Sequence, residues 1–344
     1  MSTTEEIRRP IVEQLAEYER FMVRNMRSDS EYVGGILDYI ISGGGKGFRP
    51  MTVLLCASLH APSGRGVDAD ANSGAGSGVR RTVGARTYLA AMLVEMMHTA
   101  SLVHDDVIDE SDTRRGRPSM RAMAGSRAAV IAGDMILAKS IVCGLDSAQY
   151  DIVDYVVRAM SELCEGELIQ SEQSRKLEMT REIYLDIIGK KTAVLFGVSA
   201  GVGALSVGAP RGAVAEMREF GELIGRAFQI KDDILDYDVS GDTGKPACND
   251  LRERKITLPL LAVLERSSPE RRAELLARLA AVADDPENIA YLHDTVVAEG
   301  GIEEAERVMR SYVDRAVVIL APYPSSPCKT SLEMLAAYAA ERKK

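Results

Sequence analysis

The stretch LAAMLVEMMHTASLVHDDVID at residues 89–109 decides the fold class. Its apolar residues recur at the i, i+3, i+4, i+7 spacing of an amphipathic helix, and the apolar stripe continues to Val103. The same helical period recurs in the segments 150–172, 180–206, 212–237, 270–282 and 302–320. No convincing alternating strand pattern accompanies them. The sequence therefore predicts an all-α protein.

Two polar segments separate helical ones without the character of interdomain linkers. Residues 61–78 are rich in Gly, Ser, Asp and Ala, which predicts a flexible surface loop with no catalytic role. Residues 241–250 form a second polar loop. We therefore expect a single domain over residues 1–344, whose 46% hydrophobic content suffices for one large core.

An acidic motif ends the first stretch and occurs again later in the chain. DDVID at 105–109 and DDILD at 232–236 both read D-D-x-x-D. On a helix the outer aspartates of each motif, at i and i+4, share one face. Two acidic clusters repel each other unless a cation lies between them, and Mg²⁺ binds carboxylates together with water and phosphate oxygens. The two motifs therefore indicate a Mg²⁺-bound diphosphate held between two helices.

A solvated helix face and a calcium loop are less favourable interpretations of the acidic motifs. A single D-D-x-x-D is more often a solvated helix face, but both copies here follow apolar sequence, SLVH at 101–104 and AFQI at 227–230. A calcium loop starting at Asp236 fails, because its twelfth position should be a bidentate glutamate and is Ala247.

Four groups of basic residues could accompany a diphosphate. In GGGKGFRP at 43–50, glycines allow close backbone approach, and Lys46 and Arg49 precede or begin a predicted helix. It is not a Walker A loop, because Gly47 occupies the Ser/Thr position. The other groups are RRGRP at 114–118, KT at 191–192, and the pair Lys245 and Lys255. Arginine suits phosphate because its guanidinium binds two oxygens at once.

Composition narrows the functional classes further. A net charge of −9 argues against a general nucleic-acid binder. The five cysteines are scattered with no C-x-x-C pair, which suggests reduced thiols. The acidic N-terminal sequence lacks a signal-peptide core, and we expect no apolar run to be long enough to span a bilayer. We therefore expect a cytoplasmic protein with at most peripheral membrane contact, for product release.

Together these groups resemble the trans-polyprenyl diphosphate synthase family, in particular its long-chain, octaprenyl-type members. The resemblance runs from about residue 34 to residue 259 and more loosely beyond. It rests on GGKxxRP at 44–50, HxxxxxHDDxxD at 98–109, RRG at 114–116, GD at 133–134, GExxQ at 166–170, KTA at 191–193, FQxxDDxxD at 228–236 and GK…DL…KxTLP at 244–259. It implies an all-α isoprenoid-synthase bundle around a deep central cavity, usually a homodimer.

The resemblance also implies a role for each matched residue. The metal ligands would be Asp105, Asp106, Asp109, Asp232, Asp233 and Asp236, the last of them indirectly, around three Mg²⁺. Positions around the allylic diphosphate are Arg114, Lys191, Thr192, Gln229 and Lys245, with Lys255 as a further cation beyond the loop. The isopentenyl diphosphate pocket would contain Lys46, Arg49, His98 and Arg115.

Catalysis in such enzymes relies on electrostatic stabilisation. Metal held by Asp105, Asp106, Asp109 and Asp232, with Arg114, Lys191 and Lys245, would stabilise the diphosphate that leaves the allylic substrate. The double bond of isopentenyl diphosphate attacks the resulting carbocation, and a proton is lost to the departing diphosphate. Apolar walls exclude water that would quench the cation.

Product length depends, in this family, on residues one turn before the first acidic motif. Ala100 and Ser101 stand there, where farnesyl-type enzymes carry an aromatic. We therefore expect a farnesyl or geranylgeranyl primer and a product longer than geranylgeranyl diphosphate. The floor of the tunnel would be set deeper, by Met97, Ile136 or Ile141.

The sequence departs from the family pattern at two positions, and other functions remain as alternatives. Gly47 stands where the family often has Arg, and Arg254 where Gly often precedes the lysine of KxTLP. Either departure could weaken isopentenyl diphosphate binding or only alter loop geometry. A short-chain synthase is the nearest alternative. A terpene cyclase or head-to-head synthase is disfavoured, because neither needs the isopentenyl diphosphate pocket. A non-catalytic subunit of a heteromeric synthase usually loses part of an aspartate motif, whereas both are whole here.

Overall fold

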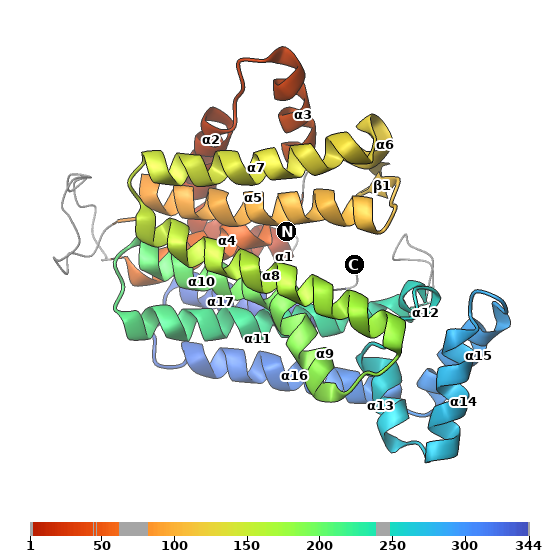
Figure 1. Ribbon diagram of the computed structural model, residues 1–344. Helices are drawn as coiled ribbons and strands as arrows, with labels where there is room; N and C mark the ends of the chain where they lie inside the picture. Colours follow the sequence, from red (N-terminus) through yellow and green to blue (C-terminus); the bar gives the residue numbers. More distant parts are fainter. Residues whose placement is uncertain (1–2, 44, 46, 62–81, 239–247, 343–344) are drawn as a thin grey trace. The chain divides into compact units, whose positions relative to one another are not determined.

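The computed structural model describes residues 3–43, 45, 47–61, 82–238 and 248–342, without the side chains of residues 174 and 175. These residues are almost entirely helical (Figure 1), which confirms the predicted all-α class. The single sheet that they contain has two strands of two residues each. The predicted flexible loop at 61–78, apart from Ala61, lies outside the described residues, as do Lys46 and Lys245.

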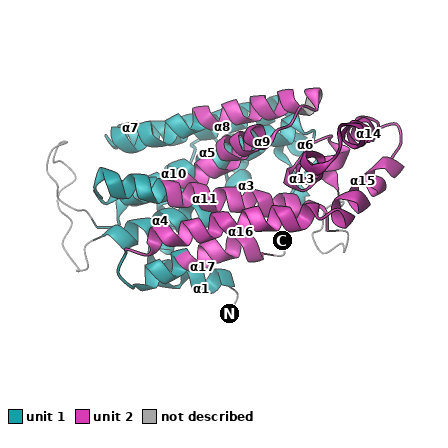
Figure 2. Ribbon diagram, turned by 90° about the horizontal axis from the view of Figure 1, so that it is seen from below, with its two compact units in different colours: residues 1–160, 198–218, 323–332 teal, residues 161–197, 219–322, 333–344 magenta. Residues whose placement is uncertain are grey.

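The chain divides into two compact units (Figure 2). Unit 1 comprises residues 1–160, 198–218 and 323–332, and unit 2 comprises residues 161–197, 219–322 and 333–344. The division falls within α8 (Tyr150–Lys176), α10 (Val194–Ser206), α11 (Arg211–Asp236) and α17 (Pro327–Glu341). The single domain expected from sequence stays a prediction.

Unit 1 is built around α5 (Ala85–Ile108), the helix predicted from the first stretch. Its other elements are α1 (Thr3–Arg8), the 3₁₀ turn η1 (Arg9–Ile11), α2 (Val12–Asn25), α3 (Glu31–Ile41), α4 (Phe48–His60), β1 (Thr113–Arg114), β2 (Arg117–Pro118), α6 (Met120–Ala124) and α7 (Ser126–Asp146). Helices α5 and α7 lie side by side (Figure 1), and α5 also packs against α2 and α4. The apolar stripe of α5 is buried from Leu89 to Val103. Each such buried Leu or Met side chain contributes about 1.5–3 kcal/mol.

Unit 2 is centred on the short helix α13 (Leu258–Arg266), nearly all of which is buried. Its other elements are α9 (Arg181–Ile188), the π-helical turn η2 (Gly189–Ala193), α12 (Asn249–Arg252), α14 (Pro269–Ala280), α15 (Glu287–Ala298) and α16 (Gly301–Leu320). Helix α13 packs against α9, α14, α15 and α16.

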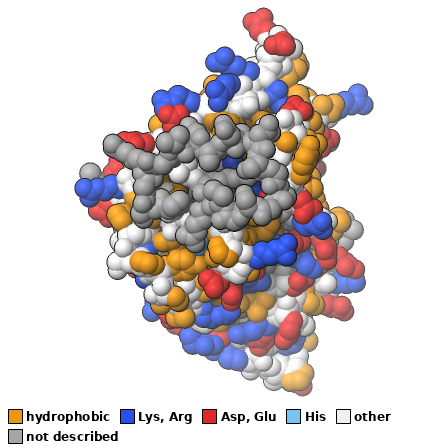
Figure 3. All heavy atoms as spheres, turned by 90° about the vertical axis from the view of Figure 1, so that its left-hand side faces the viewer, with side chains coloured by type: hydrophobic (Ala, Val, Ile, Leu, Met, Phe, Trp, Pro, Cys, Tyr) orange, Lys and Arg blue, Asp and Glu red, His pale blue; other side chains and the backbone are white. Residues whose placement is uncertain are grey.

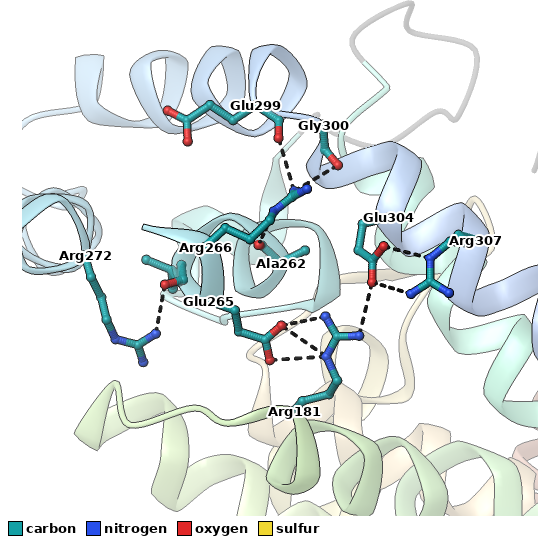
Figure 4. A network of polar contacts seen from close by, with 10 residues as sticks. Arg181, Ala262, Glu265, Arg266, Arg272, Glu299, Gly300, Glu304 and Arg307 are labelled. Carbon is teal, nitrogen blue, oxygen red and sulfur yellow. Dashed lines mark hydrogen bonds and ion pairs between the residues drawn. The ribbon is translucent and has the colours of Figure 1, made fainter. Parts of the chain in front are cut away.

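The start of α9 is fixed by a cap and by ion pairs. The Thr180 hydroxyl accepts a hydrogen bond from the Ile183 N–H, as an N-cap does. Arg181 Nη2 then donates to Glu265 of α13 at 2.5 Å, and its Nη1 donates to Glu304 of α16 at 3.2 Å (Figure 4). Partly exposed ion pairs of this kind are worth about 1 kcal/mol or less each. Their effect is to hold the first turn of α9 against two other helices of unit 2.

Two helical runs are long and apolar enough to cross a membrane by length and composition alone, namely 126–146 and 181–206. The expectation that no run reaches that length is therefore wrong. Of the second run's apolar window, 78% is buried inside the protein, against 33% for the first. Core helices of soluble proteins pass the same test, so two such runs are weak evidence for a membrane span.

On the face shown in Figure 3, acidic and basic side chains are interspersed with apolar ones.

Candidate active site

The first acidic motif occupies the last turn of α5 in unit 1. Asp109 is the C-cap, and its N–H donates to the Asp105 carbonyl at 2.8 Å. Asp105 is half-buried and Asp109 is exposed, one turn apart on the helix, as the spacing predicts. Asp106 points inward and is only 3% exposed. The motif thus offers two carboxylates to its surroundings and buries the third.

A tight hairpin brings the R-R-G motif back to Asp106. Strands β1 and β2 pair antiparallel, with Arg115 and Gly116 as the two-residue connection at φ of 53° and 75°. Two positive φ angles are the mark of a type I′ turn, which suits a glycine at its second position. Arg114 at the start of the turn donates Nε and Nη2 to Asp106 Oδ1 at 2.9 and 2.5 Å. The predicted allylic-site arginine is therefore paired with a predicted metal ligand.

Three of the residues assigned to isopentenyl diphosphate come together in unit 1. Burial lowers the pKa of Arg49 to about 10, although Glu95 nearby raises it. Burial also lowers the pKa of His98 well below its usual range, and the neighbouring Arg49 and Arg115 lower it further. Burial raises the pKa of Glu95, and the charges of Arg49 and Arg115 oppose that rise. Glu95 was not predicted; the signal available was a charged residue inside the apolar stripe, three positions before His98.

The residues predicted to control product length lie on α5, on the N-terminal side of its acidic motif. Ala100 is fully buried and Met97 nearly so. Ser101 is half-buried, and its hydroxyl donates to the His98 carbonyl at 2.9 Å. On α7, Ile136 is fully buried, whereas Ile141 is half-buried. Their part in chain length stays a prediction.

The second acidic motif ends α11 in unit 2, and each aspartate has a different environment. Asp232 is 45% exposed at its side chain and pairs with Arg342 Nη2 at 2.7 Å. Arg342 also lies over the Phe228 ring, 3.7 Å from its centroid. Asp236 accepts the N–H groups of Asn249 and Asp250 at 3.0 and 2.9 Å and so caps α12. The expectation of an indirect role for Asp236 in metal binding stays a prediction.

Asp233 is buried within a chain of hydrogen bonds. The Tyr184 hydroxyl donates to Asp233 Oδ2 at 2.5 Å, and Gln229 Nε2 donates to Oδ1 at 3.0 Å. The Thr192 hydroxyl donates to Gln229 Oε1 at 2.7 Å. Burial raises the pKa of Asp233 to about 6, and the two hydrogen bonds oppose the rise. Hydrogen bonds therefore connect three residues that were predicted separately, with Gln229 between Thr192 and Asp233.

Lys191 lies in a π-helical turn, a feature frequent at functional sites. Its ammonium donates to Glu167 at 2.9 Å and to Gln170 at 2.7 Å. Gly166 leaves room for this turn, because a Cβ at position 166 would lie 2.9 Å from the backbone nitrogen of Lys191. The G-E-x-x-Q motif at 166–170 therefore makes room for Lys191 and binds its ammonium group.

These side chains line a pocket of about 130 Å³ in unit 2. Its polar walls are Gln170, Gln173, Tyr184, Lys191, Thr192, Gln229, Asp233, Asp250, Lys255 and Thr257. Met179, Ile187, Ile188 and Ile256 form its apolar part. Lys255 also pairs with Glu253. Tyr184 was missed from sequence, and Asp250, which belongs to the quoted DL, was given no role. Burial raises the pKa of Asp250, and the Asp233 and Asp236 carboxylates raise it further.

A family model described as Polyprenyl synthetase matches residues 30–296, which include both acidic motifs and the pocket. The chain belongs to the polyprenyl synthetase family. It is accordingly a trans-prenyltransferase, as the resemblance implied.

Relatives in this family match nearly the whole chain. Octaprenyl diphosphate synthase of Escherichia coli K12 is 31% identical over 343 residues, covering 98% of each chain. Heptaprenyl diphosphate synthase component 2 of Geobacillus stearothermophilus is 32% identical over 329 residues, covering 95% of each. A crystal structure of a Caulobacter crescentus CB15 polyprenyl synthase, complexed with calcium and isoprenyl diphosphate, is 30% identical with a TM-score of 0.85. It covers 99% of this chain and 98% of its own.

The two departures from the family pattern share a backbone conformation. Gly47 caps α4 at φ 62°, in the left-handed region that glycine occupies without strain. Arg254 occupies the same region at φ 56°. A side chain in that region costs about 1–2 kcal/mol. The chain therefore has a glycine at one left-handed position and an arginine at the other.

Polyprenyl synthetases are generally metal-dependent, and the donor set here fits a hard cation. Among the residues that the structure describes, no three His, Cys, Asp or Glu side chains converge on one point. Mg²⁺ needs only one or two carboxylates when phosphate oxygens and water complete its shell. The aspartates of the two motifs supply oxygen ligands of that kind, and their assignment as ligands stays a prediction.

Proposed function

We propose that this prenyltransferase condenses farnesyl or geranylgeranyl diphosphate with successive isopentenyl diphosphates, head to tail, to a long-chain all-trans polyprenyl diphosphate. The observation that carries the proposal is the pocket of unit 2. Its lining includes Lys191, Thr192, Gln229 and Lys255, together with Asp233 of the second acidic motif and several apolar side chains. Cations and amide donors suit a diphosphate, and apolar walls suit a prenyl chain.

Mg²⁺, in three ions when bound, would neutralise the charge that develops on the leaving diphosphate. Asp105, Asp109 and Asp232 would supply carboxylate ligands to it. Lys191 is held in position by Glu167 and Gln170, so its charge is available without reorganisation. Arg114 is held in the same way by Asp106. A residue that acts as nucleophile is not required, because ionisation of the allylic substrate supplies the electrophile.

The long-chain part of the proposal rests on small residues and on the names of relatives. Ala100 and Ser101 precede the first acidic motif by five and four positions, and neither is bulky. The Escherichia coli relative is named an octaprenyl diphosphate synthase. A short-chain synthase is the alternative, and it would make farnesyl or geranylgeranyl diphosphate.

We also propose that the enzyme is a cytoplasmic homodimer that contacts a membrane only peripherally. The second candidate, a subunit of a heteromeric synthase, is favoured by the Geobacillus relative, which is named as a component. Both aspartate motifs are whole in this chain, and this supports activity without a second component.

Steady-state assay of the purified chain distinguishes these functions. With Mg²⁺, farnesyl diphosphate and isopentenyl diphosphate, we expect release of pyrophosphate and loss of both substrates. Asp105→Ala and Asp232→Ala should each lower kcat by about a hundredfold or more. Turnover that appears only after a second protein is added would support the heteromeric alternative. Consumption of the allylic diphosphate without isopentenyl diphosphate would indicate a cyclase or a hydrolase.

A further inference from the structure

We propose that Tyr184 is a positioning residue of the prenyl-transfer site: its hydroxyl holds Asp233, and through Asp233 it sets the orientation of Gln229 and Thr192. The inference rests on the proposed function, because Gln229 and Thr192 are assigned to the allylic diphosphate. It also gives Asp233 a task other than metal binding.

The geometry of Asp233 is that of a buried anchor. It is 3% exposed, and both oxygens are occupied, Oδ2 by the Tyr184 hydroxyl and Oδ1 by Gln229 Nε2. Asp232, next to it in sequence, is 45% exposed at its side chain. A carboxylate with both oxygens bonded and little exposure is poorly suited to a hydrated metal ion. Its neighbour is the better ligand.

The direction of each hydrogen bond follows from the carboxylate. An ionised carboxylate only accepts, so Tyr184 must donate and Gln229 must turn its NH₂ group toward Asp233. Gln229 Oε1 then faces Thr192, and the Thr192 proton is committed to it. The orientation of two substrate-site groups is therefore decided at Asp233.

Tyr184 is itself fixed by the structure of α9. Arg181, one turn before it, is tied to Glu265 and Glu304 (Figure 4). Tyr184 is only 3% exposed, so its ring is packed and its hydroxyl has a defined place. The Tyr184 hydroxyl is therefore a fixed donor, and it can hold the hydrogen bonds of Asp233 and Gln229 in one arrangement. If the hydroxyl turned away, a buried oxygen of Asp233 would be left without a hydrogen-bond donor.

Removal of the hydroxyl alone tests the inference. In Tyr184→Phe, the initial rate of the first condensation at saturating substrates should fall about tenfold, while the KM for isopentenyl diphosphate stays within about twofold. None of the residues assigned to isopentenyl diphosphate is a member of this hydrogen-bond chain. Tyr291→Phe is the matched control: its hydroxyl bonds Arg271 and Glu274 outside the pocket, at 2.6 and 3.1 Å. That variant should keep the kinetics of the wild type.

A double-variant cycle shows whether Tyr184 acts through Gln229. If it does, Tyr184→Phe/Gln229→Leu should be no slower than Gln229→Leu alone, within about twofold. Losses that multiply, or a Tyr184→Phe enzyme as fast as the wild type, would overturn the inference and leave the proposed function intact.

Asp233→Asn supplies a second test that does not depend on the folding of Tyr184→Phe. The asparagine keeps the volume but places an NH₂ group where the network needs an acceptor, so the same loss of rate is expected. Full activity in Asp233→Asn would overturn the inference. A wild-type enzyme that extends no allylic diphosphate at all would overturn the inference and the proposed function together.

Discussion

Arg342 Nη2 lies 2.7 Å from Asp232 Oδ1, so an aspartate of the second motif whose side chain is 45% exposed is already paired with a cation. The guanidinium is buried and held by the Phe228 carbonyl at 2.9 Å as well as by the Phe228 ring. A metal ion that uses Asp232 must share this carboxylate with Arg342 or displace it.

Removal of Arg342 should therefore strengthen metal binding and weaken the fold. In Arg342→Ala, Mg²⁺ should reach half-maximal activation at a lower concentration, because a competing cation is gone. The free energy of unfolding should fall by about 1–2 kcal/mol through lost packing and cation–π contact. Titration of activity with Mg²⁺ and urea denaturation check both. Arg310→Ala, which removes an exposed pair with Glu306, should change neither; a raised Mg²⁺ requirement in Arg342→Ala would contradict the competition.

Loss of Arg114 should leave a buried charge without its partner. Asp106 is 4% exposed at its side chain and Arg114 35% exposed, so Arg114→Leu should lower the free energy of unfolding by about 2 kcal/mol. Arg121→Leu is the control, since its partner Asp112 is 78% exposed. Equal destabilisation of the two variants in urea would show that the burial of Asp106 is unimportant.

Relief of the left-handed strain at Arg254 should stabilise the protein. Arg254→Gly removes a side chain from φ 56°, and the gain of about 1–2 kcal/mol exceeds the entropy that glycine adds to the unfolded chain, about 0.5–1 kcal/mol. A net gain of about 0.5–1 kcal/mol should appear in urea denaturation. The reciprocal variant Gly47→Ala should destabilise. An unchanged or lower stability of Arg254→Gly would show that the conformation carries no cost.

Acidification should destabilise the folded chain through His98. Burial lowers the pKa of His98, so below about pH 6.5 the unfolded chain binds more protons than the folded one, and stability falls as pH falls. His98→Gln should lose that part of the pH dependence, whereas His293→Gln should keep it. The same slope in all three proteins would show that His98 does not contribute.

A bulky residue before the first acidic motif should shorten the product. Ser101→Phe places a ring on α5 at a half-buried position, and we expect shorter prenyl diphosphates in the product mixture. Ala100 is fully buried, so Ala100→Phe should in addition destabilise the protein by about 1–3 kcal/mol. An unchanged product length in both variants would refute the idea that small residues at positions 100 and 101 let the prenyl chain grow past them.

The sequence predicted those parts of the structure that local patterns specify. The helical period predicted α5 and the placement of Asp105 and Asp109 one turn apart on it. Contacts between distant residues were not predictable in this way. Tyr184 and Asp233 are 49 positions apart, and Arg342 and Phe228 are 114 apart. No local pattern marks such pairs, because they depend on how helices pack.

The burial of individual acids was also beyond the sequence. All six motif aspartates were predicted as metal ligands, yet Asp106 and Asp233 face inward to Arg114 and Tyr184, and Asp236 caps α12. The rotation of a helix about its own axis decides which of two adjacent aspartates is exposed. Glu95 was missed for the same reason, since a charge on the buried stripe has meaning only beside Arg49 and Arg115.

Mass spectrometry of the product tests the central claim most directly. The purified protein is supplied with Mg²⁺, farnesyl diphosphate and excess isopentenyl diphosphate, and the prenyl diphosphates are resolved by mass. We expect a ladder of condensation products that ends at one species longer than geranylgeranyl diphosphate. Farnesyl diphosphate left unextended, while dimethylallyl or geranyl diphosphate is elongated, would contradict the long-chain product, and the absence of any condensation product would contradict prenyl transfer itself.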